Sequence, residues 1–197
     1  MLKDRLYTTA AKSHARRSAQ TALHRITHAM LRWMAPFLSF TAEEAWPIFA
    51  GGPQRRPVTS SIFTETYARF DAPDAGLLAK WGRIREIRDV VNKEIESVRA
   101  AGALGSSLQA AVRIAAPAED RALLAGLGDD LRFVLITSAA EVIEGEALAV
   151  SVMPREAPKC ERCWHYREDV GVDPAHPTLC GRCVANLFGD GEARRVA

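Results

Sequence analysis

The feature that most constrains this chain is a set of four cysteines near its C-terminal end. They form two Cys-x2-Cys pairs separated by sixteen residues, Cys160 with Cys163 and Cys180 with Cys183, and the sequence contains no other cysteine. Two such pairs supply four thiolates, which close the tetrahedral shell that zinc prefers. The spacing therefore predicts one structural zinc ion on these four residues, with no open position for catalysis.

The main alternative for the cysteines is a pair of disulfide bonds. Disulfides persist in oxidising compartments, and residues 1–17 contain no apolar stretch of the kind found in a secretory signal. We therefore expect a cytoplasmic protein with reduced thiols. His165 and His176 lie close enough in the sequence to be rival ligands, although four thiolates already suffice.

The charge of the chain is unevenly distributed. The net charge is only +2, but residues 1–36 carry seven basic residues against one acidic residue, whereas residues 106–157 carry four basic and eight acidic residues. A basic end segment beside an acidic middle indicates a nucleic-acid face on part of the molecule. The alternative is an ordinary solvated helix face. No apolar run approaches the roughly 20 residues of a membrane span, so no membrane partner is expected.

The first half of the chain reads as helical. Residues 13–34 repeat apolar side chains near the helical period, and the predicted buried stripe is Ala15, Ala19, Leu23, Ile26, Met30 and Trp33. Thr41 and Glu44 have the spacing of a capping box that opens a second, short helix. The aromatic residues of this region are expected in the core, because aromatic rings bury much apolar area; they are Trp33, Phe37, Phe40, Trp46 and Phe49.

The segments after residue 50 differ in composition and periodicity from the helical region before them. Residues 51–75 are rich in Pro, Gly, Ser and Thr and predict a loop with a turn of helix. Residues 76–100 predict a long helix that ends near Gly102. Its predicted buried stripe is Leu77, Trp81, Ile84, Ile87 or Arg88, Val91, Ile95 and Val98. Beyond residue 104 we expect a mixture of strands and helices. They are a strand near 108–114, a helix over 118–126, a helical turn leading into a strand over 129–137, and short strands near 142–143 and 148–152.

These elements define a mainly α chain in three parts. The predicted division is an antiparallel helical bundle over residues 1–103, a small α+β unit over 104–157, and a zinc-knuckle module with the C-terminal tail over 158–197.

Several motifs together resemble the C-terminal region of bacterial isoleucyl-tRNA synthetases, which are class I enzymes. They are KDRLY at 3–7, ARRSAQ at 15–20, LRWMAPFLSFTAEEAW at 31–46, VNKEIE at 91–96, LGSSL at 104–108, KCERCWHY at 159–166, CGRCV at 180–184 and GDGEARR at 189–195. The helical motifs are shared loosely with valyl and leucyl synthetases, whereas the paired zinc knuckles point to isoleucine. The resemblance covers almost the whole chain.

The resemblance implies a class I anticodon-binding bundle and a zinc module that grip the anticodon stem-loop of isoleucine tRNA, alongside the rest of the synthetase chain. It implies zinc as the one metal, and ATP only in the complete parent enzyme. The candidate RNA contacts, suited to stacking and phosphate binding, are Arg16, Arg17, Arg162, Trp164, His165, Tyr166 and Arg182. Trp164 has an alternative role, packing over the metal site.

The signatures of the class I catalytic domain, a His-Ile-Gly-His-like motif and a Lys-Met-Ser-Lys-Ser-like motif, do not occur in these 197 residues. The chain is therefore expected to be a fragment, an excised domain or a truncated product that is not catalytic by itself. Two alternatives remain: a stand-alone tRNA-binding module, and the zinc-containing end of a DNA glycosylase. The glycosylase is disfavoured because the sequence begins Met1-Leu2-Lys3 rather than with the proline and glutamate of that family. No DNA partner is expected.

Overall fold

The computed structural model describes residues 2–52, 59–194 and 196. Its contacts divide the chain into two compact units. One unit is formed by residues 17–73, and the other by residues 1–16 together with 74–197. No helix of the described residues is long and apolar enough to cross a membrane.

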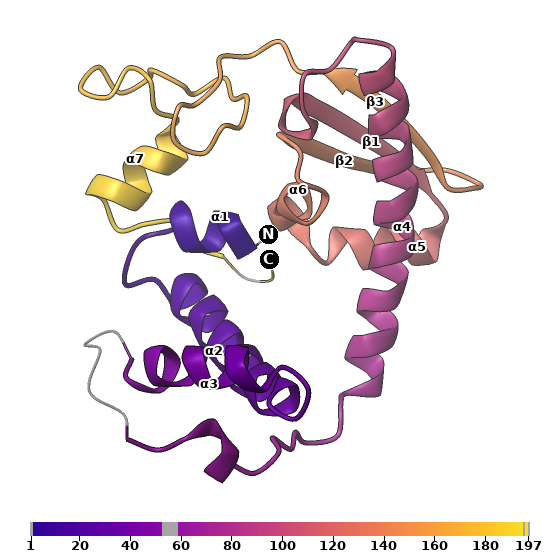
Figure 1. The fold of residues 1–197 in the computed structure, drawn as a ribbon. Coiled ribbons are helices and arrows are strands. Elements are labelled where there is room, and N and C mark those ends of the chain that lie inside the picture. Colours follow the sequence, from indigo (N-terminus) through magenta and orange to yellow (C-terminus); the bar gives the residue numbers. More distant parts are fainter. Residues whose placement is uncertain (1, 53–58, 195, 197) are drawn as a thin grey trace. The chain divides into compact units, whose positions relative to one another are not determined.

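The described chain is about half helical, with one small sheet (Figure 1). The helices are α1 (Leu2–Tyr7), α2 (His14–Met34), α3 (Ser39–Ala50), α4 (Ala75–Ala100), α5 (Ala118–Ala125), α6 (Leu131–Leu135) and α7 (Gly181–Phe188). Single 3-10 turns are η1 (Ile62–Thr64), η2 (Ser107–Gln109) and η3 (Gly128–Asp130), and the strands are β1 (Ala110–Ala116), β2 (Ala139–Glu144) and β3 (Ala149–Pro154). The helices expected over 13–34, 76–100 and 118–126 and the strands expected near 110, 142 and 150 are thereby confirmed. The strand expected within 129–137 is wrong, because the helix α6 is followed by Ile136 in a left-handed conformation and β2 begins only at Ala139.

In the unit of residues 17–73, α3 and η1 pack on the C-terminal part of α2. Its core consists of Leu31, Ala35, Ala42, Trp46 and Ile62, with Ala45 and Phe49 packed against it. The expected capping box is wrong, because α3 begins at Ser39 and Thr41 already lies inside the helix. Glu43 instead accepts hydrogen bonds of 2.9 Å from the Ser61 hydroxyl and the Ile62 amide, which holds η1 against α3.

The expected aromatic core of this unit is only partly correct. Trp46 is buried and Phe49 packs against the core, but Trp33, Phe37 and Phe40 are 44%, 72% and 91% exposed. The predicted stripe of α2 is likewise partly correct, since Ala15 and Ala19 are buried but Ile26 and Met30 are about half exposed. The physical reason is that the Leu31 and Ala35 side of α2 faces α3 and η1, so these larger side chains lie elsewhere on the helix surface.

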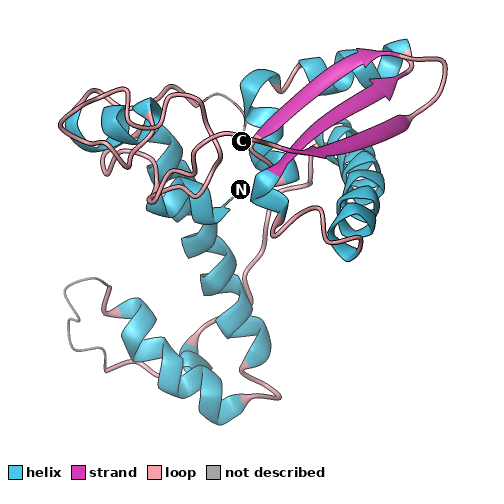
Figure 2. Ribbon diagram, turned by 90° about the horizontal axis from the view of Figure 1, so that it is seen from above, coloured by secondary structure: helices cyan, strands magenta, loops and turns pink. Residues whose placement is uncertain are grey.

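In the other unit, β1 is the central strand of the sheet. It pairs in parallel with β2 and antiparallel with β3, so the order is β2-β1-β3 (Figure 2). Val112 and Ile114 point into the core on alternate positions, whereas Arg113 is exposed and forms a 2.8 Å ion pair with Glu141 on β2. The chain returns from β2 at Gly145, where a Cβ atom would come within 2.9 Å of the Ala115 side chain.

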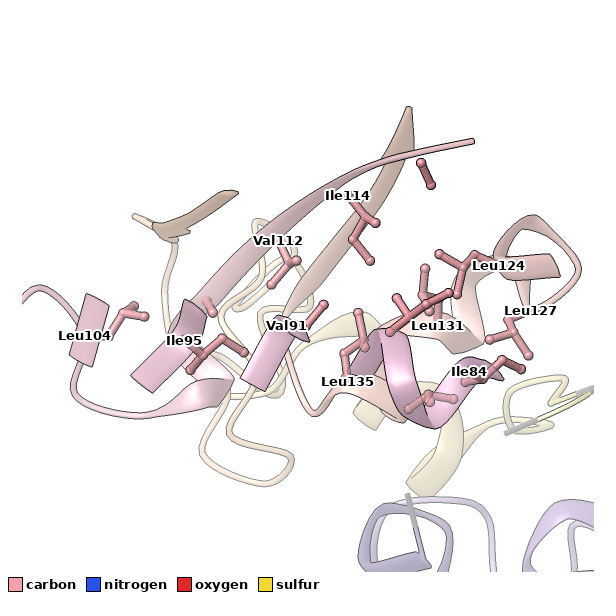
Figure 3. Close-up of a cluster of buried hydrophobic side chains, with 14 residues drawn as sticks. Ile84, Val91, Ile95, Leu104, Val112, Ile114, Leu124, Leu127, Leu131 and Leu135 are labelled. Atoms are coloured by element: carbon pink, nitrogen blue, oxygen red, sulfur yellow. The ribbon is translucent and has the colours of Figure 1, made fainter. Parts of the chain in front are cut away.

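The core of this unit lies between α4, the sheet and helices α5 and α6 (Figure 3). Ile84, Ile87, Val91 and Ile95 form the buried stripe of α4, as the sequence predicted, and all are at most 2% exposed. Trp81 and Val98 are partly buried against this core, but Leu77 in the first turn is 53% exposed and was wrongly predicted as buried. At the start of the helix the Asp74 carboxylate accepts a 2.9 Å hydrogen bond from the Leu77 amide. Gly102 follows the other end at a φ of +80° and confirms the expected terminating glycine. Because α4 packs on the sheet, it belongs with residues 104–157 by contact; the division into 1–103, 104–157 and 158–197 stays a prediction.

Candidate metal centre and its surroundings

The four cysteine sulfurs converge on one point. All four residues are buried, their Sγ atoms lie within 4.8 Å of one another, and those of Cys163 and Cys180 are 3.7 Å apart. Tetrahedral zinc with Zn–S bonds of about 2.3 Å places its sulfurs about 3.8 Å apart. The donor set and its spacing therefore fit zinc, and among the described residues this is the group that could hold a metal.

The first knuckle is a tight turn over Cys160–Tyr166. The Trp164 amide donates to the Cys160 carbonyl and the Cys160 amide donates to the His165 carbonyl, both at 2.9 Å. Trp164 has a φ of +64°, a left-handed conformation that reverses the chain directly after Cys163. A bridge between Lys159 and Tyr166 then closes the turn. This backbone geometry explains how two residues three positions apart both turn their sulfurs to the same point.

The second knuckle leads into α7. Cys180 precedes the helix and Cys183 lies in its first turn. The Cys180 amide donates a hydrogen bond to the Cys160 sulfur at 3.4 Å. Hydrogen bonds from Cys163 and then from Cys183 lower the pKa of the Cys180 thiol. Donors that converge on sulfur are a common support for thiolate ligands.

Arg162 anchors this module to the first helix. Its guanidinium donates to the carbonyls of Thr8 at 2.7 Å and Tyr7 at 3.0 Å, which lie at the C-terminal end of α1, and it lies 3.8 Å from the Cys183 sulfur. A cation at a helix C-terminus satisfies carbonyls that have no partner within the helix. Arg162 was a candidate RNA contact, but the structure commits its guanidinium to these internal acceptors.

Arg182 occupies the centre of a buried ion network. It donates to Asp4 at 2.7 Å, to Glu192 at 2.8 Å and to the Thr8 hydroxyl at 2.8 Å, and its side chain is 5% exposed. Burial opposes its charge, but Glu192 and Asp4 raise its pKa overall. The Nη1 atom of Arg182 has no hydrogen-bond partner among the described residues. Arg182 was a candidate RNA contact, and the structure places its guanidinium inside this buried network.

Phe133 forms the floor of the same network. The guanidinium of Arg182 lies 4.6 Å from its ring centre and that of Arg194 lies 3.4 Å from it. Arg194 also pairs with Asp4. The ring thus supports two cations, each balanced by carboxylates from opposite ends of the chain.

His165 is also withdrawn from the surface. Its imidazole is buried, its Nδ1 atom lies 3.0 Å from the Cys163 carbonyl oxygen, and its ring meets the edge of Phe133 at 5.5 Å. Burial lowers its pKa to about 4, so the ring is neutral at physiological pH. His165 was a candidate RNA contact, and the structure places its ring in the interior against Phe133. The other rival ligand, His176, stacks on Phe188 at 4.0 Å.

The remaining candidates are accessible to different degrees. Trp164 is 60% exposed, with the Lys159 ammonium 5.9 Å from its ring. Tyr166 is half-buried, and its amide donates to the Ser138 hydroxyl at 2.7 Å. Arg17 is exposed and Arg16 is half-buried near the start of α2. Among the candidates of the zinc module, Trp164 is thus the ring most open to a ligand.

Sequence reasoning missed the residues that complete the ion network. Asp4, Glu192 and Phe133 had no assigned role, although Asp4 is the single acidic residue among the first 36. A single carboxylate in a basic segment indicates an ion pair with a basic residue, and this could have been predicted from the sequence. Its partner 178 residues away could not have been found in that way.

Comparison with known proteins agrees with this geometry. Residues 1–114 match the family described as "Anticodon-binding domain of tRNA ligase". The chain belongs to this family. Residues 158–186 match the family described as "Zinc finger found in FPG and IleRS". The second description covers two kinds of protein, and the match over residues 1–114 favours the ligase over a glycosylase.

Similar proteins carry the name isoleucine--tRNA ligase. Those of Ralstonia pickettii (strain 12J) and Cupriavidus metallidurans (strain ATCC 43123 / DSM 2839 / NBRC 102507 / CH34) are 58% and 59% identical over 202 residues, and that of Thiobacillus denitrificans (strain ATCC 25259 / T1) is 57% identical over 201 residues. Each alignment covers 100% of this chain and 21% of the relative. The chain thus spans about a fifth of the length of the curated relatives it matches. The zinc-finger match and the cysteine cluster together support a structural zinc.

Proposed function

We propose that this chain is the part of an isoleucine--tRNA ligase that binds the anticodon stem-loop of isoleucine tRNA, and that it serves ATP-dependent charging carried out elsewhere in the parent enzyme. The observation that carries the proposal is the joint presence of an anticodon-binding domain and a four-cysteine cluster in one chain. The helices then form part of a class I anticodon-binding bundle, and the rest of the synthetase is a partner. Because bacterial translation takes place in the cytoplasm, the proposal includes a cytoplasmic location.

In this proposal Cys160, Cys163, Cys180 and Cys183 hold the zinc, which supplies rigidity rather than chemistry because four thiolates leave no open position. Both knuckles depend on that one ion for their relative position, since the buried apolar cluster of this module consists of the cysteines themselves.

Trp164 is the residue proposed to contact an unstacked base. Its ring is 60% exposed on the turn that directly follows the metal ligands Cys160 and Cys163, and bases of a loop stack on such rings. Lys159 beside the ring supplies positive charge for a phosphate. Arg16 and Arg17 at the start of α2 are proposed as separate phosphate contacts. Tyr166 is a secondary candidate. In this proposal Arg162, His165 and Arg182 stabilise the zinc module and do not contact RNA.

The test compares two stem-loops that differ only in the anticodon. The unmodified, zinc-loaded chain is expected to bind the isoleucine stem-loop more tightly, and Trp164→Ala is expected to weaken that binding by about 1–3 kcal/mol and to reduce the preference. Phe188→Ala, which removes another exposed ring of the same module, is the matched control. Equal affinity of the unmodified chain for both stem-loops contradicts specific anticodon binding.

The same variant also decides the alternative role of Trp164. If the ring only covers the metal site, Trp164→Ala lowers the affinity for zinc and leaves the anticodon preference of the metal-loaded chain unchanged. Zinc content is therefore measured on each sample before RNA is added.

A further inference from the structure

A second surface with the chemistry of a nucleotide site lies in the unit of residues 17–73. It is an open groove of about 970 Å³ between α2 and the extended segment that follows η1. Arg25 and Arg32 line it from α2, and Tyr67, Arg69 and Phe70 line it from the segment. None of these residues belongs to the zinc module.

Three arginines of the groove differ in whether a described acidic residue pairs with them. Arg32 donates to Glu65 at 2.7 Å and lies 2.9 Å from the His28 ring, so its charge is balanced internally. For Arg25 and Arg69 the structure records no acidic partner among the described residues. Two guanidinium groups in one groove provide phosphate contacts.

Two aromatic rings at the groove are available for stacking. Tyr67 is 61% exposed and Phe70 is 59% exposed. The edge-on contact of Phe70 with Trp33, with ring centres 5.8 Å apart at 79°, orients the ring without stacking on it. Exposed rings beside unpaired cations are the elements with which proteins bind unpaired nucleotides.

Asp71 narrows the class of ligand. Its exposed carboxylate also lines the groove, and a site for phosphate alone or for an acidic peptide gains nothing from an anion. A nucleobase does use such a group, because its amino groups donate to carboxylates. Cations, rings and an acceptor in one groove match a ligand that has a phosphate, a π-face and an amino edge.

We propose that this groove binds an unpaired nucleotide of the tRNA loop, with the base on Phe70 and Tyr67 and the phosphate on Arg25 and Arg69. The inference rests on the proposed function and adds a second RNA contact outside the zinc module. The groove lies within residues 1–114, which match the anticodon-binding family.

The experiment uses the anticodon stem-loop of isoleucine tRNA with a fluorescent 2-aminopurine placed in turn at each loop position. Phe70→Ala and Tyr67→Ala are each expected to weaken binding by about 5- to 150-fold and to relieve quenching at one loop position. Phe63→Ala is the matched control, because Phe63 is 58% exposed in the same unit but does not line the groove. Phe70→Trp keeps a stacking surface and should keep the affinity.

The cations are tested by salt dependence. Arg25→Ala and Arg69→Ala are each expected to lower the slope of log affinity against log salt by about 0.7, the value for one phosphate contact to a single strand. Arg69→Lys should retain the slope. Thermal unfolding of every variant, followed by circular dichroism, separates a lost contact from a lost fold.

The possible outcomes distinguish this inference from the function on which it rests. If the groove variants bind like Phe63→Ala while Trp164→Ala weakens binding, the groove is not an RNA site and the proposed function stands. If the unmodified chain binds no stem-loop, both fall. If Phe70→Ala leaves the RNA affinity of the complete ligase unchanged, the groove does not bind a nucleotide there and the inference is overturned.

Discussion

Arg182 and Asp4 form an ion pair of 2.7 Å although they lie 178 residues apart in the sequence. Both side chains are largely buried, and Glu192 and Arg194 extend the pair into a network. This pair joins α1 to α7, and so joins the first residues of the chain to the metal-binding module.

Removal of Asp4 is expected to destabilise this unit strongly. Asp4→Ala leaves two buried guanidinium groups short of one carboxylate, and breaking a buried pair in this way costs about 3 kcal/mol or more. Chemical denaturation of the zinc-loaded chain measures the loss. Glu141→Ala is the control, because it removes an ion pair that is more than half exposed and is expected to cost less than about 1 kcal/mol. Equal losses for the two variants would show that the buried network contributes little.

Asp120 is expected to make stability depend on acid pH. Hydrogen bonds from Arg83 of 2.7 and 2.8 Å hold the pKa of Asp120 below its ordinary value of 3.8. A carboxyl whose pKa is lower in the folded state stabilises the fold above the unfolded pKa, and this contribution disappears as pH falls through the folded value. Asp120→Asn should therefore cost about 1 kcal/mol at pH 7, a modest figure because Arg83 is 44% exposed. The difference from the unmodified chain should shrink below about pH 4; a difference that stays constant down to pH 2 contradicts this assignment.

Zinc is expected at one equivalent per chain, and its removal should disorder residues 158–188. The reason is that this segment has little apolar core beyond the four cysteines. The unit of residues 17–73 has its own core and should remain folded. Metal analysis and hydrogen exchange before and after chelation check both statements. A metal content well below one equivalent, or one transition in which the whole chain melts on chelation, would be incompatible with them.

Two glycines should respond in opposite directions to the same substitution. Gly171 has a φ of +79°, and a Cβ atom there would lie 2.9 Å from the Pro177 carbonyl oxygen, so Gly171→Ala should cost at least about 1 kcal/mol and lower zinc affinity. Gly82 lies within α4 with open space around its Cα atom, so Gly82→Ala should raise stability by about 0.5–1 kcal/mol. Paired thermal melts and zinc titrations test the contrast, which is lost if both variants shift the same way.

The purified chain by itself is expected to show no isoleucine-dependent exchange of pyrophosphate into ATP. The nucleotide-binding signatures of class I synthetases do not occur in its 197 residues. Exchange above a blank without enzyme would contradict this expectation. A complete ligase serves as the positive control.

Local patterns in the sequence predicted the metal centre and α4 well. The cysteine spacing alone predicted the four buried thiols, and the repeat of Ile84, Ile87, Val91 and Ile95 predicted the buried face of α4. Both features depend on residues a few positions apart, and their geometry follows from one turn or one helix.

Features that depend on distant partners were not predictable. Phe40 is an aromatic residue of the kind expected in a core, but it is 91% exposed, because burial depends on which side of the helix other elements cover. Thr41 had the spacing of a cap, but Ser39 already lies in the helix, where its hydroxyl donates to the Ala35 carbonyl at 2.9 Å. Arg182 looked like a phosphate contact because the sequence does not show that Asp4 reaches it.

Residues 1–16 and 74–197 form one unit although 57 residues of a different unit separate them in the chain. In topological terms, the unit that contains the zinc module is discontinuous, and its first segment is attached to it by side chains as well as by the polypeptide. If the chain is cut between residues 17 and 73, α1 becomes a peptide ligand of the zinc module, held by Arg162 on its carbonyl end and by Arg182 on Asp4. Proteolysis in that interval therefore does not by itself separate the two ends of the protein.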